Sequence, residues 1–192
     1  MEESFNDRLM NPQYEIIEGV KYMAPSGSGE HSTAIGNLYG IFWDYLWNNN
    51  CGRVFHDSLD VHFPDGNVFQ PDLKIVLDPS IIKRRGVIYG VPDLCAEVLS
   101  KSTAKKDIGI KKDVYERNGV REYWIINPTD KSITVYHLLE GKYVLDDVYS
   151  VYNPVEWENL TDEERAAAKF KIKVTLFDDL EVDVHDVFRW ID

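Results

Sequence analysis

The sequence has only two cysteines and no long hydrophobic run, and both shortages limit what the protein can be. Cys51 and Cys95 are too few for a disulfide framework in a chain of 192 residues. We therefore expect both to be reduced packing residues in a cytoplasmic protein. No apolar run approaches the roughly 18 residues that a membrane span needs. Residues 1–10 are polar and acidic, which predicts that they are not a secretory signal.

Basic residues are scarce as well, because 21 Lys and Arg stand against 33 Asp and Glu, for a net charge of −12. This balance argues against a protein that coats nucleic acid non-specifically. The charge is uneven, however. Residues 81–121 contain ten Lys and Arg against five Asp and Glu, whereas residues 140–192 contain six against fourteen. The basic block is either a contact surface for a nucleic acid backbone or a solvated helix face.

Several catalytic motifs are missing from the chain. It has no Gly-rich phosphate loop, no Cys and His spacing typical of zinc and no G-x-S-x-G elbow. It also has no internal repeat, low-complexity segment, linker or recognisable DNA-reading module. An apolar content of 44% is ordinary for a globular protein, and 192 residues are enough for one real core. We predict a single domain over residues 1–192.

Hydrophobic periodicity predicts alternating strands and helices. We expect a hairpin at 14–17 and 20–23, helices at 30–47, 103–118 and 161–169, and strands at 54–55, 59–63, 68–77, 94–99, 123–126, 133–138, 143–149, 172–177 and 180–184.

Charged residues break the hydrophobic pattern at a few neighbouring places. Glu97 lies inside an apolar strand, where an acid costs several kcal/mol unless something pairs with it. Asp72 lies on the preceding strand. On the helix expected at 103–118, a helical wheel places Asp107 and Lys111 inside the inward arc that includes Ile108. Two charged residues one turn apart are thus expected to face the sheet.

Two interpretations of these residues stay open. In one, Asp107 and Lys111 form an i,i+4 salt bridge worth ~0.3–0.5 kcal/mol, with Lys111 extending outward, and Asp72 only satisfies a turn. In the other, Asp72 and Glu97 form a hard-cation site suited to Mg²⁺, and the lysine stabilises a phosphate oxyanion. The conjunction of all four residues favours the second.

The same residues carry a family resemblance. Pro71-Asp72, followed 25 residues later by Glu97, resembles the PD-(D/E)xK nuclease pattern, and the chain more specifically resembles the Uma2 (DUF820) family of restriction-endonuclease-like proteins. The matching blocks are Y-E-I-I-E-G-V (14–20), A-P-S-G-S-G-E-H (24–31), Q-P-D-L (70–73), P-D-L-C-A-E-V-L-S (92–100), S-T-A-K-K-D (102–107), G-V-R-E-Y-W-I-I-N-P (119–128) and F-D-D-L-E-V-D (177–183).

The resemblance implies an α/β fold with a mixed central β-sheet flanked by helices, together with added antiparallel strands. It also implies a Mg²⁺ or Mn²⁺ site made by Asp72, Glu97 and the carbonyl of Val98. His31 or Glu30 would complete this site from the first helix. The helical wheel favours His31, since Glu30 lies only at the edge of the inward arc; the alternative is that His31 is an ordinary core histidine.

One position departs from the general nuclease pattern. The lysine expected two residues after the glutamate is Leu99 here. Lys101 keeps the alternation but lies beyond the strand, so we take Lys111 as the lysine that has moved to the helix. Gln70, which would share a strand face with Asp72, and Tyr115 are candidates for substrate contact, and structural packing is the alternative for both.

These residues predict a Mg²⁺- or Mn²⁺-dependent endonuclease that acts on DNA. The alternative is a nuclease-fold binding or assembly module that no longer cleaves, which the charge of −12 and the missing strand lysine favour and the retained buried charges oppose. Hydrolysis of another phosphate ester on the same site is a third reading. A homodimer is compatible with a nuclease, and Trp43 and Trp47, expected on the outer face of the first helix, are the candidate interface.

Overall fold

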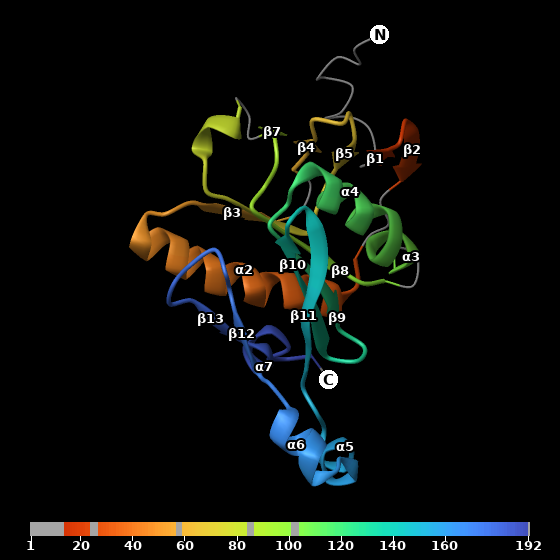
Figure 1. Cartoon of the computed structure of the whole chain (residues 1–192), viewed down its shortest axis with the longest axis vertical. Helices are drawn as coiled ribbons and strands as arrows, with labels where there is room; N and C mark the ends of the chain where they lie inside the picture. The colour runs from red at the N-terminus through yellow and green to blue at the C-terminus, as the bar shows by residue number, and fades with distance from the viewer. Residues whose placement is uncertain (1–13, 24–26, 57–58, 84–86, 101–103, 192) are drawn as a thin grey trace.

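The structure is a computed structural model that describes residues 14–23, 27–56, 59–83, 87–100 and 104–191 (Figure 1). Its helices are α2 (Gly29–Asn49), α3 (Ala104–Lys106), α4 (Lys112–Asn118), α5 (Pro154–Asn159), α6 (Asp162–Ala167) and α7 (Val184–Val187), with a 3-10 turn at Pro79–Ile81 and a π-helical turn at Asp107–Lys111. Its strands are β1 (Tyr14–Ile17), β2 (Val20–Met23), β3 (Arg53–His56), β4 (Val61–His62), β5 (Val68–Phe69), β6 (Leu73–Val76), β7 (Ile88–Tyr89), β8 (Leu94–Val98), β9 (Glu122–Asn127), β10 (Ser132–Leu139), β11 (Lys142–Ser150), β12 (Lys171–Lys173) and β13 (Glu181–Asp183).

A six-stranded sheet with the order β11-β10-β9-β8-β6-β3 forms the centre of the molecule (Figure 1). It is mixed, because β8 and β9 run parallel and the other neighbours run antiparallel. The parallel pair is joined by the connection that contains α3, the π-turn and α4, as parallel neighbours need a long crossover. The predicted mixed sheet with helices and added antiparallel strands is confirmed.

Alternate residues of the central strands face two different cores. The first core joins one face of the sheet to α2 and to the C-terminal segment. It includes Ala34, Ile35, Leu38, Phe42 and Leu46 from α2 and Leu73, Ile75, Leu94, Ala96, Val98, Trp124 and Ile126 from the sheet.

The second core lies on the opposite face of the central sheet. There α4 and a smaller sheet with the order β2-β1-β5-β4-β7 cover the strands. Its buried members include Ile17, Val61, Phe69, Cys95, Val114, Tyr115, Tyr123 and Ile125. Cys95 belongs to this core, and Cys51 is a free, half-buried thiol. The candidate site lies beside this second core.

Helix α2 matches its prediction closely, because its ends carry ordinary stop signals. The hydroxyl of Ser28 accepts a hydrogen bond from the backbone N–H of His31, which caps the first turn. Asn50 adopts a left-handed conformation (φ 48°) that ends the helix. No helix within the described ranges is long and apolar enough to cross a membrane.

The strand expected at 68–77 is wrong as a single element. The structure divides it into β5 of the small sheet and β6 of the central sheet, with Gln70, Pro71 and Asp72 between them. Proline has no N–H to donate to a strand ladder, so Pro71 is a natural break. The strands expected at 172–177 and 180–184 are shorter than expected, and β12 and β13 form a separate two-stranded sheet rather than joining the central sheet.

Candidate active site

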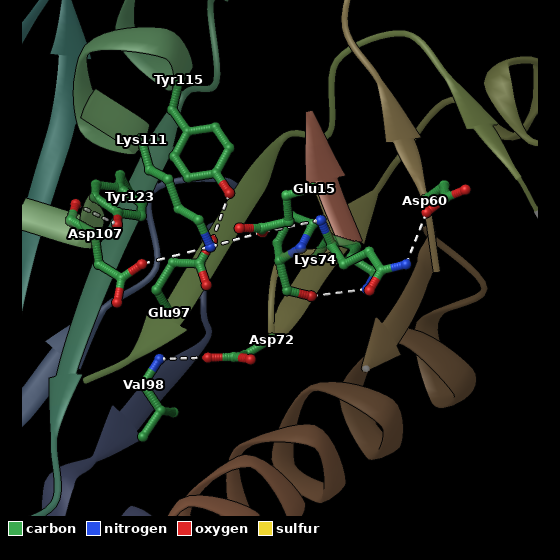
Figure 2. Close-up of polar contacts among 12 residues, drawn as sticks. Glu15, Asp60, Asp72, Lys74, Glu97, Val98, Asp107, Lys111, Tyr115 and Tyr123 are labelled. Carbon is green, nitrogen blue, oxygen red and sulfur yellow. Dashed lines mark hydrogen bonds and ion pairs between the residues drawn. The ribbon is translucent and has the colours of Figure 1, made fainter. Parts of the chain in front are cut away.

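Asp72 directly precedes β6, and Glu97 lies on the neighbouring strand β8. The antiparallel register pairs Leu73 of β6 with Ala96 of β8, so the residues next to this pair, Asp72 and Glu97, come from adjoining segments. The Oδ2 atom of Asp72 accepts a hydrogen bond from the backbone N–H of Val98 at 2.7 Å (Figure 2). The two acids differ in exposure, since the side chain of Asp72 is 22% exposed and that of Glu97 is 2% exposed. Asp72 is therefore partly exposed to solvent, whereas Glu97 is buried.

Lys111 lies at the centre of a buried group of carboxylates. Its Nζ atom is 2.8 Å from Glu15 Oε1, 3.1 Å from Glu97 Oε1 and 3.4 Å from Asp107 Oδ1 (Figure 2). All four residues are less than 10% exposed. An ammonium group has three N–H donors, so three carboxylates can use all of them. With three acids against one base, these four residues hold an excess of negative charge.

The π-helical turn explains how Asp107 and Lys111 both face inward. A π-turn contains one residue more than an α-helical turn, so it rotates the following residues relative to a regular helix. Asp107 and Lys111, at the two ends of this turn, are buried, whereas Ile108 is 54% exposed. The inward position expected for Ile108 is therefore wrong, and the inward positions of Asp107 and Lys111 are confirmed. The i,i+4 contact between them also exists, but within a buried cluster rather than at the surface.

Burial raises the pKa of Glu97 well above its ordinary value, and the negative charges of Asp72, Asp107 and Glu15 raise it further, whereas Lys111 lowers it. Burial lowers the pKa of Lys111, but Glu97 and the other carboxylates outweigh this and raise it well above its ordinary value. The neighbouring carboxylates thus favour the charged form of Lys111, and burial is the main factor that opposes the charged form of Glu97.

Two tyrosines complete the polar lining from α4 and β9. The hydroxyl of Tyr115 donates to Glu97 Oε1 at 2.5 Å, and the hydroxyl of Tyr123 donates to the backbone carbonyl of Asp107 at 2.9 Å. Burial raises the pKa of both phenols, which therefore act as neutral donors. Tyr115 is fully buried, so in this arrangement its hydroxyl contacts Glu97.

His31 reaches the acid pair from the first turn of α2. Its Nε2 atom lies 3.4 Å from Asp72 Oδ1, and its side chain is 16% exposed. Glu30, the alternative at this position, is exposed. The structure thus places His31 beside Asp72, and the helical wheel had indicated only that His31 faces inward.

Gln70 does not share a strand face with Asp72, because the chain leaves β5 before it enters β6. Its side-chain amide donates to Asp60 Oδ1 at 2.8 Å, and its backbone N–H donates to Glu15 Oε1 at 3.3 Å. Lys74 is on β6 and is fully buried, with its Nζ donating to the carbonyl of Pro71 at 2.8 Å.

Three members of the basic block of residues 81–121 are not free cations. Lys111 is buried, and Arg117 and Arg121 lie beside the acids Asp65 and Asp93. The alternative lysine, Lys101, lies outside the described residues, as do residues 84 and 85.

The donor chemistry of the pair fits a hard divalent cation. Asp72 and Glu97 supply carboxylate oxygens, the ligand type that Mg²⁺ and Mn²⁺ prefer, and the cluster behind Glu97 has negative charge in excess. Within the described ranges, however, no three His, Cys, Asp or Glu side chains are grouped closely enough to form a metal site by themselves. A cation would thus need ligands beyond these two carboxylates, and backbone carbonyls such as that of Val98 are of the right type.

Glu15 is the residue of the cluster that sequence reasoning missed. It lies on β1, where both Tyr14 and Glu15 are buried. Its strand parity with Ile17 could have indicated an inward acid, as for Glu97. Its partner is 96 residues away in the chain, so no local pattern could have indicated Lys111.

Comparisons with known proteins agree with this architecture. A family model described as "Uma2: Putative restriction endonuclease" matches residues 3–168. Among solved structures, the chain is similar to a protein from Anabaena variabilis ATCC 29413 described as "a putative nuclease belonging to DUF820". The TM-score is 0.66 and the identity is 19%, over 98% of this chain and 99% of that chain. The likeness confirms the predicted fold class. No curated protein matches the sequence.

Proposed function

Because the chain belongs to the Uma2 family, we propose that it is an endonuclease that hydrolyses DNA phosphodiester bonds with the help of a bound Mg²⁺ or Mn²⁺ ion. The observation that supports this most is that Asp72 and Glu97 come from adjoining segments at the edge of the β6–β8 pairing, with the Lys111 Nζ 3.1 Å from Glu97 Oε1. Its cytoplasmic location and its single-domain organisation stay predictions from the sequence.

In this proposal, Asp72, Glu97 and the Val98 carbonyl hold the cation. When bound, the cation would supply Lewis-acid polarisation of the phosphoryl group and a lowered pKa for the attacking water. Asp72 is the more exposed acid, so it faces the substrate side of the site, and its bond from the Val98 N–H fixes the direction of its carboxylate. His31, 3.4 Å from Asp72, orients the same carboxylate from α2.

Lys111 contributes its positive charge. Its three donors already face Glu15, Glu97 and Asp107, so direct contact with a phosphate oxygen requires that it give up one of these carboxylates. Its first role is therefore to hold Glu97 in place and to offset part of the negative charge that would repel a phosphodiester. Tyr115 supports Glu97 in the same way through its hydroxyl.

A nuclease-fold module that binds or assembles without cleaving is the second candidate. The net charge of −12 and the pairing of Arg117 and Arg121 with acids favour it, because both weaken attraction to a DNA backbone. The buried Glu97 and Lys111 oppose it, since buried charges cost stability and a structural core would be served by apolar residues. Hydrolysis of a different phosphate ester would use the same residues.

The test is cleavage of supercoiled plasmid and single-stranded DNA with Mg²⁺, with Mn²⁺ and with a chelator. Asp72→Ala should abolish cleavage, and Lys111→Ala should reduce it strongly. Glu163→Ala, at an exposed acid on α6, should leave it unchanged. Lys111→Arg keeps the charge and serves as a control for folding.

Loss of cleavage in Asp72→Ala but not in Lys111→Ala would support Asp72 and Glu97 as the metal ligands and would point to Lys101 as the catalytic lysine. Absence of cleavage by folded wild-type protein on every DNA substrate would refute the nuclease and favour the binding module.

A further inference from the structure

Helix α2 carries a narrow stripe of glycine and tryptophan on its outer face. Gly36, Gly40, Trp43 and Trp47 follow one another at spacings of four, three and four, which places them along one side of a helix. Trp43 and Trp47 are 44% and 70% exposed, and their rings stack with centroids 5.3 Å apart. The buried residues of α2 are on the other side, against the first core.

The fold of one chain does not explain the two glycines. A Cβ atom added at Gly36 or at Gly40 would meet no atom within 4 Å, and neither glycine is among the positive-φ residues of the described chain. Glycine inside a helix lowers helix stability relative to alanine, so the open space above these two glycines comes with a loss of helix stability. The stripe also carries no charged residue, in a protein with 33 acids. Interface centres are typically poor in charge and rich in tryptophan.

The stripe is complementary to itself. In an antiparallel pair of α2 helices related by a twofold axis between residues 41 and 42, Gly36 lies opposite Trp47 of the second copy, and Gly40 lies opposite Trp43. Each glycine then provides the hollow that an indole of the second copy fills, and the same contacts repeat with the copies exchanged, as an isologous interface requires. We propose that two copies of this chain associate through the Gly36-Gly40-Trp43-Trp47 stripe of α2.

The exposed tryptophan surface is large enough to supply the centre of such an interface. The Asn37 side-chain amide donates to the carbonyl of Arg189 at 2.9 Å, which joins α2 to the C-terminal segment. Figure 1 shows α2 with the C-terminal segment beside it. At 150–250 Å² for a buried aromatic residue, the exposed parts of Trp43 and Trp47 offer roughly 170–290 Å² per copy. That is roughly a fifth to a third of the ~800 Å² that each partner contributes to a standard interface.

The pairing leaves the candidate active site open. His31 lies about ten residues from the axis, or about 16 Å along the helix at 1.5 Å per residue. The inference therefore does not depend on the proposed nuclease activity and can be tested without it.

The test is the mass of the full chain in solution, by analytical ultracentrifugation over a range of concentrations. Wild type is expected to be a dimer. Gly40→Leu fills the hollow but has room in the monomer, so it should weaken association at least about 30-fold while the thermal stability of the chain is kept or raised. Trp43→Ser should weaken association to a similar degree. Glu163→Leu, which adds an exposed leucine on α6, should leave association unchanged.

A wild-type monomer throughout, or a dimer that neither Gly40→Leu nor Trp43→Ser weakens, would overturn the proposal. A monomer whose tryptophan fluorescence is quenched by single-stranded DNA would also overturn it, in favour of base stacking on the same indoles.

Discussion

Replacing Lys111 by methionine tests the buried charge cluster most sharply. Methionine has a similar length and no charge, so the variant leaves Glu15, Glu97 and Asp107 together without their shared cation. Removing one partner of a buried ion pair typically costs about 3–5 kcal/mol. At about 2–4 °C per kcal/mol for a chain of this size, we expect the melting temperature to fall by about 6–20 °C near neutral pH.

The cost of Lys111→Met should depend on pH, and its sign follows from Glu97. The folded-state pKa of Glu97 is raised above its unfolded value, so Glu97 favours the folded state most below about pH 4.5 and loses that contribution as pH rises through the folded pKa. Lys111 is the group that lowers this pKa, so its removal moves the folded value higher. The destabilisation caused by Lys111→Met should therefore be small near pH 4.5 and should grow toward pH 8.

Urea denaturation from pH 4.5 to pH 8 measures this dependence. The control is Lys105→Met, an exposed lysine on α3, which should change the free energy of unfolding by less than about 0.5 kcal/mol at every pH. The double variant Glu97→Gln with Lys111→Met should recover part of the loss, and it keeps the measurement possible at high pH, where Lys111→Met alone is least stable. A cost of Lys111→Met below about 1 kcal/mol at pH 8, or one that does not change with pH, would refute the charged cluster.

Three further substitutions probe single contacts. Tyr115→Phe removes the hydroxyl that donates to Glu97, and should lower the free energy of unfolding by about 1.5–3 kcal/mol in urea titrations. His31→Gln, beside Asp72, should reduce Mn²⁺-dependent cleavage about 10–100-fold with little change in melting temperature, and an unaltered rate would remove His31 from the site. The buried carboxylate of Glu122 accepts hydrogen bonds from surrounding N–H groups. Glu122→Gln replaces one of its oxygens by an amide donor that faces these N–H groups, so it should lower the free energy of unfolding by about 1–3 kcal/mol. It should not change the metal dependence of cleavage.

Local patterns were sufficient for much of the fold. The hairpin at 14–23 was predicted correctly, because Glu18-Gly19 suits the turn, and both residues have positive φ. Helix α2 and the meander of β10 and β11 were also predicted within about two residues. In each case, hydrophobic spacing and turn residues within the element determine the structure, so no distant part of the chain was needed.

The strand break and the π-turn required information that local periodicity does not hold. A strand pattern continues through Gln70, Pro71 and Asp72 if only alternation is read, and Pro71 was the sign that it stops. A helical wheel assumes 100° per residue, so it misplaces Ile108 once a π-turn changes the rotation. Burial of Asp107 and Lys111 was nevertheless predicted, because they break an otherwise apolar arc.

The candidate site was predicted only as far as its own strand and helix allow. Asp72, Glu97 and Lys111 were each visible as polar residues in apolar surroundings. Glu15 was not, because its role depends on a contact between β1 and the π-turn, which only the folded chain brings together. That contact makes the cluster richer in acid than the sequence indicated.

Calorimetric titration of the purified chain with Mn²⁺ at neutral pH tests the central claim most directly. The acid pair should bind one Mn²⁺ per chain, and Asp72→Asn, which keeps an acceptor for the Val98 N–H but loses the charge, should abolish or greatly weaken that binding while the protein stays folded. Absence of Mn²⁺ binding by folded wild-type protein, or equal binding by Asp72→Asn, would contradict a cation site at Asp72 and Glu97.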